Sequence, residues 1–206
     1  MQVKVWSDYI CPWCYLGRDR TALLRALDVE VTQLPFELHP ELPRDGRWVS
    51  PRGRLSAVYA SIGRECRELG IPFRAPALVP NSRRALDTAE VVRRRWPAAF
   101  RALDDSLFDA HFVTGLDIGD PEILATLVEQ SGAPSTEVDA ALEGGEGARS
   151  VASSMESARE LGIAATPAWL FGDSFVVPGV QPREFFERVV TRLRARTGDV
   201  PAGPGR

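Results

Sequence analysis

Two of the three cysteines in this 206-residue chain lie three residues apart, in the segment Cys11-Pro12-Trp13-Cys14. The segment follows a short apolar stretch and opens a helical pattern. Residues three apart on a helix bring their Cβ atoms to about 5 to 6 Å, and the Cα atoms of a disulfide lie about 5.5 Å apart. The two sulfurs can therefore join and part without a change of fold, which favours a redox-active pair.

Position along the helix predicts different roles for the two sulfurs. Cys11 stands at the helix start, where the helix dipole and unpaired N–H groups stabilise a thiolate. Cys14 lies one turn inside, where burial keeps it protonated until Cys11 has reacted. We therefore expect Cys11 to attack and Cys14 to resolve the mixed disulfide. Pro12 and Trp13 add no positive charge beside the cysteines, which suggests an intermediate redox potential. The Trp13 side chain is expected either to shield the disulfide or to contact apolar partners.

Zinc sites use the same cysteine spacing, so a metal centre is the main chemical alternative. Four-ligand zinc needs two more ligands, and Cys66, His39 and His111 stand at spacings that fit no zinc pattern. We therefore expect no metal. Cys66 lies on an apolar helical stripe, which favours a buried free thiol over a second redox centre. The two histidines are expected to be structural or surface residues.

The charge of the chain gives no general attraction to nucleic acid or anionic lipid. Lys and Arg number 25 and Asp and Glu 28, for a formal net charge of -3. Arginines cluster at 83–84 and 93–95, but Asp87 and Glu90 dilute them, which favours a solvated helix face over a phosphate or acidic-partner site. We expect neither nucleic acid nor membrane as a partner.

The start of the chain carries no pattern of a secretory signal. Met1 is followed almost at once by the apolar stretch Val3 to Trp6, with no basic region or small-residue cleavage site. No apolar run approaches the roughly 18 residues that span a bilayer. We expect a soluble, cytoplasmic protein, in which a structural disulfide is disfavoured.

Patterning predicts a strand-helix-strand unit at the start of the chain and mixed structure at its end. Strands are expected at 3–6 and 29–38, with a helix from Pro12 between them. The last third predicts a helix over 148–161 that stops at Gly162. After this helix we expect strands at 168–171 and 175–177, a final helix through Phe185 to Leu193, and a mobile tail after Arg196.

A long helical stretch separates these two parts. From about Leu55 to Leu142 nearly every segment has helical periodicity, and Asp120-Pro121 is a good helix start. We therefore expect an α/β fold in which residues 1–45 and 150–206 form one discontinuous domain and residues 46–149 form a helical insertion.

The chain resembles the thioredoxin superfamily, specifically its DsbA-like branch with a helical insertion, and within it the FrnE-like oxidoreductases. The resemblance rests on the cysteine motif and on segments in the expected order: Ser7 to Gly17, Pro35 to Pro40, Asn81 to Ala85, Leu107 to Asp120 and Glu160 to Pro182. It implies a thioredoxin-like fold. It also implies a thiol-disulfide oxidoreductase that acts on protein thiols and disulfides, needs no bound cofactor, and is open to recycling by glutathione or a thioredoxin system.

The resemblance also assigns a role to the distant Thr166-Pro167 pair. It implies a cis peptide bond that faces the cysteines and exposes backbone groups to align a partner chain beside Cys11. Asn81 either lines the cleft that faces the motif or starts a helix.

A different enzyme class shares this resemblance. The kappa-class glutathione transferases and the 2-hydroxychromene-2-carboxylate isomerases have this fold and a segment like Asn81-Ser82. Those enzymes place a serine where Cys11 stands and lack the resolving cysteine. The presence of both sulfurs favours disulfide exchange, and a glutathione-dependent isomerase or transferase is the alternative.

Overall fold

The structure is a computed structural model that describes residues 1–197. The glycine- and proline-rich tail, which we expected to be mobile, lies outside the described residues. So do the last nine residues of the expected discontinuous domain.

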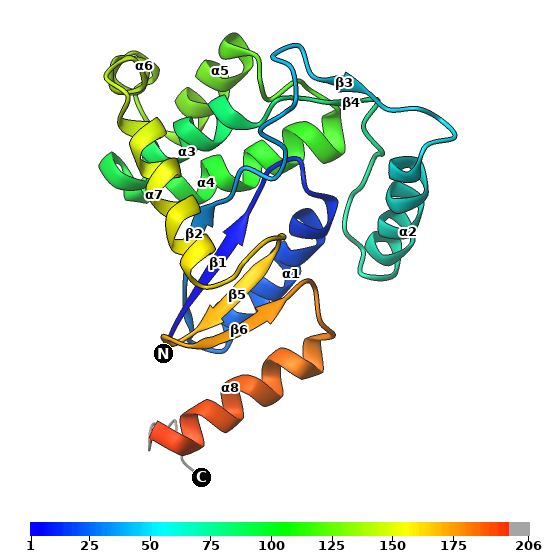
Figure 1. Cartoon of the computed structure of the whole chain (residues 1–206), viewed down its shortest axis with the longest axis vertical. Helices are drawn as coiled ribbons and strands as arrows, with labels where there is room; N and C mark the ends of the chain where they lie inside the picture. The colour runs from blue at the N-terminus through cyan, green and yellow to red at the C-terminus, as the bar shows by residue number, and fades with distance from the viewer. Residues whose placement is uncertain (198–206) are drawn as a thin grey trace.

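A four-stranded mixed sheet forms the centre of the fold (Figure 1). Its strands are β1 (Gln2–Ser7), β2 (Glu30–Pro35), β5 (Ala168–Phe171) and β6 (Phe175–Pro178), in the order β2-β1-β5-β6. β1 pairs parallel with β2 and antiparallel with β5, and β5 pairs antiparallel with β6. The two ends of the described chain therefore share one sheet.

Helices cover both faces of this sheet. α1 (Pro12–Ala26) and α8 (Arg183–Thr197) lie on the face to which Val3, Val5 and Trp169 point. α7 (Glu146–Glu160) lies on the other face, where Trp6 packs with Ala168 and Leu170. Side chains alternate between the faces of a strand, so the sheet has an apolar core on each side.

The segment between β2 and β5 is mainly helical, as predicted. It contains α2 (Arg54–Glu68), α3 (Arg83–Arg95), α4 (Pro97–Asp109), a π-helical turn η1 (Ala110–Thr114), α5 (Pro121–Ser131), α6 (Ser135–Glu143) and α7. A short antiparallel ribbon of β3 (Arg47–Trp48) and β4 (Leu78–Val79) was not predicted. The Asp120 side chain accepts a hydrogen bond from the Glu122 N–H at 2.8 Å, which confirms the predicted start of α5.

α7 joins the helical segment to the sheet. Its first half packs against α3, and its Ala158 and the neighbouring Ile163 pack on the sheet. The boundary expected between residues 149 and 150 falls inside this helix. One continuous helix therefore contributes to both parts.

The packing of α7 on α3 depends on Gly147. A Cβ atom at Gly147 would lie 2.5 Å from the Asp87 carbonyl oxygen, well inside van der Waals contact. We expect Gly147→Ala to lower the free energy of unfolding by about 1 to 3 kcal/mol, although alanine is the better helix former. Urea unfolding followed by circular dichroism measures the change.

Gly144→Ala is the matched control, because its Cβ would meet only ordinary contacts at 3.5 Å. Equal unfolding midpoints for Gly147→Ala and the wild type would show that the two helices are free to separate slightly.

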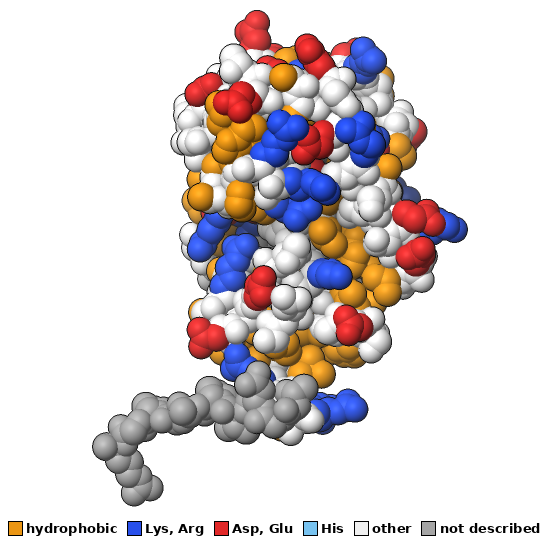
Figure 2. Space-filling model, turned by 90° about the vertical axis from the view of Figure 1, so that its left-hand side faces the viewer, with side chains coloured by type: hydrophobic (Ala, Val, Ile, Leu, Met, Phe, Trp, Pro, Cys, Tyr) orange, Lys and Arg blue, Asp and Glu red, His pale blue; other side chains and the backbone are white. Residues whose placement is uncertain are grey.

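The arginine clusters are largely neutralised on the surface. Arg83 pairs with Glu37 and Asp87, Arg84 with Asp139, Arg93 with Glu90, and Arg95 with Glu146. Basic and acidic side chains also stand among one another on the face shown in Figure 2. These pairs favour the solvated-face interpretation. Within residues 1–197 no helix is long and apolar enough to cross a membrane.

Candidate active site

The cysteine motif forms the first turn of α1, as predicted. Cys11 is the N-cap residue, with extended backbone angles of φ -82° and ψ 114°, and Pro12 is the first helical residue. Proline suits this position because its fixed φ fits the helix and its missing N–H would have no partner there. The Cys11 N–H donates to the Asp8 carbonyl oxygen at 3.1 Å, which closes the turn that leads into α1.

Both sulfurs are free thiols and are shielded from solvent. Cys11 is 2% exposed and Cys14 3%, whereas Trp13 between them is 37% exposed. A partner must therefore approach Cys11 past neighbouring side chains, of which Trp13 is the most accessible within the motif.

The two thiols have pKa values shifted in opposite directions. A hydrogen bond from Cys14 is the largest influence on Cys11 and lowers its pKa. Burial raises the pKa of Cys14 well above its usual value, and the contact with Cys11 raises it further. A hydrogen bond from the Ser7 hydroxyl lowers the pKa of Cys14 and so opposes these two effects. The Cys11 thiol is thus easier to ionise than the Cys14 thiol.

Thr166 and Pro167 lie beside the cysteine pair. The Cys11 thiol donates to the Thr166 carbonyl oxygen at 3.5 Å, and the Thr166–Pro167 peptide bond is cis. A Cβ at Gly17 would lie 3.6 Å from the Pro167 ring, so α1 passes close to it. The structure thus brings together residues 155 positions apart in sequence.

The Thr166 hydroxyl is available to a thiolate. It is buried and has no hydrogen-bond partner within the described part of the chain, yet it lies near both sulfurs and lowers both of their pKa values. A hydroxyl that donates to an anion stabilises it more strongly than it stabilises a neutral thiol. Thr166 therefore favours ionisation of the pair.

Thr166→Val should make Cys11 less reactive, because valine keeps the shape of threonine but cannot donate a hydrogen bond. We expect alkylation of Cys11 by iodoacetamide below neutral pH to slow by about fivefold. Thr88→Val is the control, since the Thr88 hydroxyl on α3 is also buried with no hydrogen-bond partner within residues 1–197, and Thr88 is not among the main influences on the pKa of either sulfur. A rate unchanged in Thr166→Val would show that the hydroxyl does not assist ionisation of Cys11.

Asp8 is a buried carboxyl that the sequence reasoning missed. It is fully buried, its oxygens accept from the Leu38 N–H at 2.7 Å and the Ile10 N–H at 3.3 Å, and burial raises its pKa to about 6. The negative charge of its carboxylate raises the pKa of Cys11 and so opposes ionisation of that thiol. In the sequence, the feature that could have pointed to Asp8 was its position three residues before Cys11.

Asn81 makes two side-chain contacts with backbone groups. Its oxygen accepts from the Arg83 N–H at 3.0 Å, and its amide donates to the Leu42 carbonyl oxygen at 2.7 Å. The helix-start interpretation accounts for the first contact, and the second ties α3 to the loop after β2. A role in a cleft that faces the cysteines stays a prediction.

The remaining candidate residues lie apart from one another. His39 is partly exposed and pairs with Glu41, whereas His111 is buried against Phe112, and burial lowers its pKa to about 4. Cys66 is fully buried in α2, and burial raises its pKa to about 11, which makes it a poor thiolate. Within residues 1–197 no group of three or more His, Cys, Asp or Glu side chains is placed to hold a metal ion.

Solved structures show the same fold. A probable DsbA oxidoreductase from Streptomyces coelicolor is 24% identical, with a TM-score of 0.84 over 100% of this chain and 93% of its own. A 2-hydroxychromene-2-carboxylate isomerase is 20% identical, with a TM-score of 0.78 over 98% of this chain and 100% of its own.

The cytosolic disulfide reductase DsbM from Pseudomonas aeruginosa is also similar. It is 20% identical, with a TM-score of 0.67 over 95% of this chain and 100% of its own, and it has also been solved with glutathione. Oxidoreductases and an isomerase therefore share this architecture.

The family comparison covers nearly the whole chain. The model described as a DSBA-like thioredoxin domain matches residues 2–191, which include the cysteine motif, the helical segment and the Thr166-Pro167 pair. The match confirms the expected thioredoxin-like fold with a helical insertion. The chain belongs to the DSBA-like thioredoxin family.

Proposed function

We propose that this protein is a cytoplasmic thiol-disulfide oxidoreductase that exchanges disulfides with protein substrates through Cys11 and Cys14. The observation that carries the proposal is the pair of adjacent thiols with opposite pKa shifts at the start of α1. Such a pair provides a nucleophile and a resolving group within one helical turn.

The exchange proceeds in two steps. The Cys11 thiolate attacks one sulfur of a substrate disulfide, forms a mixed disulfide and releases the other substrate sulfur as a thiolate. Cys14 then loses its proton and attacks the Cys11 sulfur, which releases the second substrate thiolate. The substrate gains two electrons and the cysteine pair loses two, so a thiol donor such as glutathione or a thioredoxin system must reduce the pair again.

Docking of the partner is assigned to the surface around Cys11. In this proposal the backbone of Thr166 and Pro167, which lies beside the Cys11 sulfur, aligns an extended partner chain. Trp13 adds an exposed aromatic surface for apolar side chains. In this proposal the reacting groups are the protein's own side chains and backbone, and the exchange needs no resident cofactor.

The cytoplasmic location is supported by one protein of the same fold, which is a cytosolic disulfide reductase. Fractionation of cells that produce the native protein tests this part of the proposal. Recovery with extracytoplasmic proteins would overturn it.

A glutathione-dependent isomerase or transferase is the second candidate. Its support is the likeness to the isomerase structure and the presence of glutathione in one structure of the same fold. That function predicts saturable glutathione binding and activity that survives Cys14→Ser. Disulfide exchange predicts that turnover needs both sulfurs.

Two assays separate the candidates. Reduction of insulin disulfides and reactivation of a protein with scrambled disulfides both report exchange with protein substrates. We expect turnover in at least one of them by the wild-type protein with a glutathione or thioredoxin system as electron donor. No turnover in either, together with isomerisation of a small substrate in the presence of glutathione, would establish the second candidate.

A further inference from the structure

The helix α2 carries positive charge in a chain that is acidic overall. Residues 41–74, which contain α2 and the loops on both sides of it, hold seven arginines and four acidic residues, whereas the formal net charge of the whole chain is -3. The excess of acidic residues therefore lies in the rest of the chain. A local concentration of one sign of charge attracts a partner of the opposite sign to that place on the surface.

One side of α2 is basic and open to solvent. Arg54, Arg64 and Arg67 are exposed and lie on the side of the helix that turns away from the buried residues Tyr59 and Cys66. The residues between these arginines on the same side are small, namely Ala57, Ala60 and Ser61. Arg54, Arg64 and Arg67 form the basic face of α2, which a partner can approach without displacing bulky side chains.

The arginines of the basic face have no ion-pair partner within residues 1–197, and Glu68 at the end of the helix pairs with none of them. On α3, by contrast, Arg83 and Arg93 each bind a carboxylate. The protein therefore neutralises its arginines on α3 and leaves those of α2 unpaired. Their charge is available to a partner.

The stability of α2 does not explain Arg54. It is the first residue of the helix, and no acidic residue lies in the first turn. The positive end of the helix dipole stabilises acidic side chains at this position and disfavours basic ones. Arg54 therefore works against the helix that carries it, which favours a role in binding.

The helix α2 lies beside the redox pair. It packs on α1, and Figure 1 shows it at the edge of the molecule, with no other helix on its outer side. Tyr59 belongs to the same apolar cluster as Cys11 and Cys14. Its ring centroid lies 6.4 Å from that of Phe112, which lies 5.0 Å from that of Tyr15, the residue after Cys14. The inner side of α2 thus packs around the active site, and the basic face points outward next to it.

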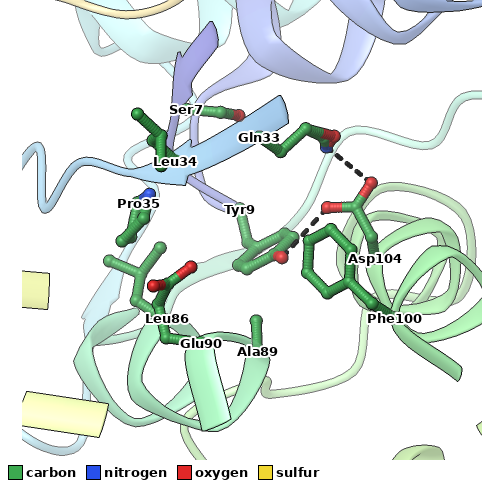
Figure 3. Close-up of a pocket in the computed structure, with 10 residues that line it drawn as sticks. All are labelled: Ser7, Tyr9, Gln33, Leu34, Pro35, Leu86, Ala89, Glu90, Phe100 and Asp104. Carbon is green, nitrogen blue, oxygen red and sulfur yellow. Dashed lines mark hydrogen bonds between the residues drawn. The ribbon is translucent and has the colours of Figure 1, made fainter. Parts of the chain in front are cut away.

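The other charged surface along α1 is different in character. An open cavity of about 450 Å³ lies between α1 and α4, and three arginines and four aspartates line it. Arg18 there binds Asp105. Asp104 lines the same cavity, and Figure 3 shows its carboxyl with hydrogen bonds from Tyr9 and Gln33. Charges of both signs meet in this cavity, so it does not select an acidic partner as the basic face of α2 can.

We propose that the basic face of α2 binds an acidic segment of the protein substrate while Cys11 exchanges with the substrate disulfide. This inference rests on the proposed function and adds a preference among protein substrates. The face from Arg54 to Arg67 is about 20 Å long, since a helix rises about 1.5 Å per residue. That length matches about six residues of extended chain. Proteins with several aspartates or glutamates near the reactive disulfide are therefore preferred.

An acidic protein segment fits this face better than a nucleic acid does. Asp45, Glu65 and Glu68 stand among the arginines of residues 41–74. They would repel the closely and evenly spaced phosphates of a nucleic acid, whereas a peptide can place its carboxylates between them. The exchange proposed for Cys11 also takes place on a protein, so both contacts are made by one substrate.

Three peptides test the preference. Each contains the same disulfide loop, flanked on both sides by six residues that are mainly glutamate, glutamine or lysine. With a thiol donor in excess, we expect kcat/KM to fall in the order glutamate, glutamine, lysine, with the glutamate peptide about tenfold above the glutamine peptide at low ionic strength. The net charge of the protein predicts the reverse order, because it is negative.

Two controls belong to the peptides themselves. Each rate is divided by the rate of the same peptide with dithiothreitol, which corrects for the intrinsic reactivity of its disulfide. The advantage of the glutamate peptide should also shrink to about twofold in about 0.5 M sodium chloride, because salt screens exposed charges.

Paired substitutions locate the effect. Arg54→Glu with Arg64→Glu should bring the ratio between the glutamate and glutamine peptides to about one or below, and Arg54→Lys with Arg64→Lys should retain most of it. Arg188→Glu with Arg192→Glu is the control, since it changes the net charge equally at two exposed positions of α8, away from α2. It should keep the wild-type ratio. The ratio compares two peptides on one protein sample, so it does not depend on the fraction of protein that is folded.

Equal rates for the three peptides with the wild type would overturn this inference and leave the proposed function intact. An equal loss of the ratio in the α8 and α2 charge reversals would also overturn it, because it would show an effect of net charge alone. Equal peptide rates together with binding of a labelled single-stranded oligonucleotide that the α2 charge reversal abolishes would assign the face to nucleic acid instead. Turnover of none of the three peptides by the wild type would refute the proposed function itself.

Discussion

Cys11→Ser is expected to abolish protein disulfide reduction, with a loss of at least about a thousandfold in turnover. Serine has nearly the same size, so the start of α1 and the contact with Thr166 should survive. A hydroxyl at that position, however, stays protonated and cannot form a mixed disulfide. The measurement is the initial rate of insulin reduction with a thiol donor in excess.

Cys66→Ala provides the control for this result. Cys66 is buried in α2 and its raised pKa makes it a poor nucleophile, so the variant should retain wild-type turnover once folding is verified. If Cys11→Ser turned over as fast as the wild type, the catalytic assignment would be wrong. A loss of turnover in Cys66→Ala, with the stability of the protein unchanged, would show that Cys66 on α2 takes part in the reaction.

Cys14→Ser should have a different result, which is accumulation of covalent complexes with substrate. Cys11 can still attack, but the neighbouring sulfur that releases the substrate is gone. An intramolecular reacting group has an effective concentration far above that of any added thiol, so the lifetime of the mixed disulfide should rise by at least about a thousandfold. Non-reducing electrophoresis and mass measurement of the trapped complexes give the result.

Cys11→Ser is the natural comparison for the trapping experiment, and the double variant should trap nothing. Rapid release of substrate from Cys14→Ser, without an added thiol, would mean that some other group resolves the complex. Retained turnover of a small substrate with glutathione in this variant would support the isomerase or transferase candidate.

Local patterns were sufficient for much of the fold. Short apolar stretches located β1 and β5, the Asp120-Pro121 pair located the start of α5, and Gly162, with φ 69°, follows the end of α7. These features depend on neighbouring residues, which is why the sequence contains them. The position of the cysteines at the start of α1 also follows from local pattern.

Features that depend on distant parts of the chain were harder to foresee. The ribbon of β3 and β4 pairs residues about 30 positions apart and is only two residues long on each side, too short for a periodic signal. The π-helical turn from Ala110 to Thr114 continues α4 with no glycine or proline inside it. Tertiary packing, not local preference, determines both.

The buried carboxyls show the same limit within the site. Asp104 lies three and four residues before Leu107 and Phe108, so its place on the apolar face of α4 was readable. What the sequence could not provide is the meeting of Asp104 with Tyr9 and Gln33, which come from two other segments. The contact of Thr166 with Cys11 was expected only from family resemblance, for the same reason.

The most direct test of the proposed exchange is a redox titration of the purified protein, followed by mass measurement after alkylation of free thiols. Reversible exchange predicts that Cys11 and Cys14 lose their two hydrogens together at one midpoint potential, while Cys66 stays alkylatable in the unfolded protein at every potential. A pair that stays as two separate thiols across the range of glutathione buffers would contradict it.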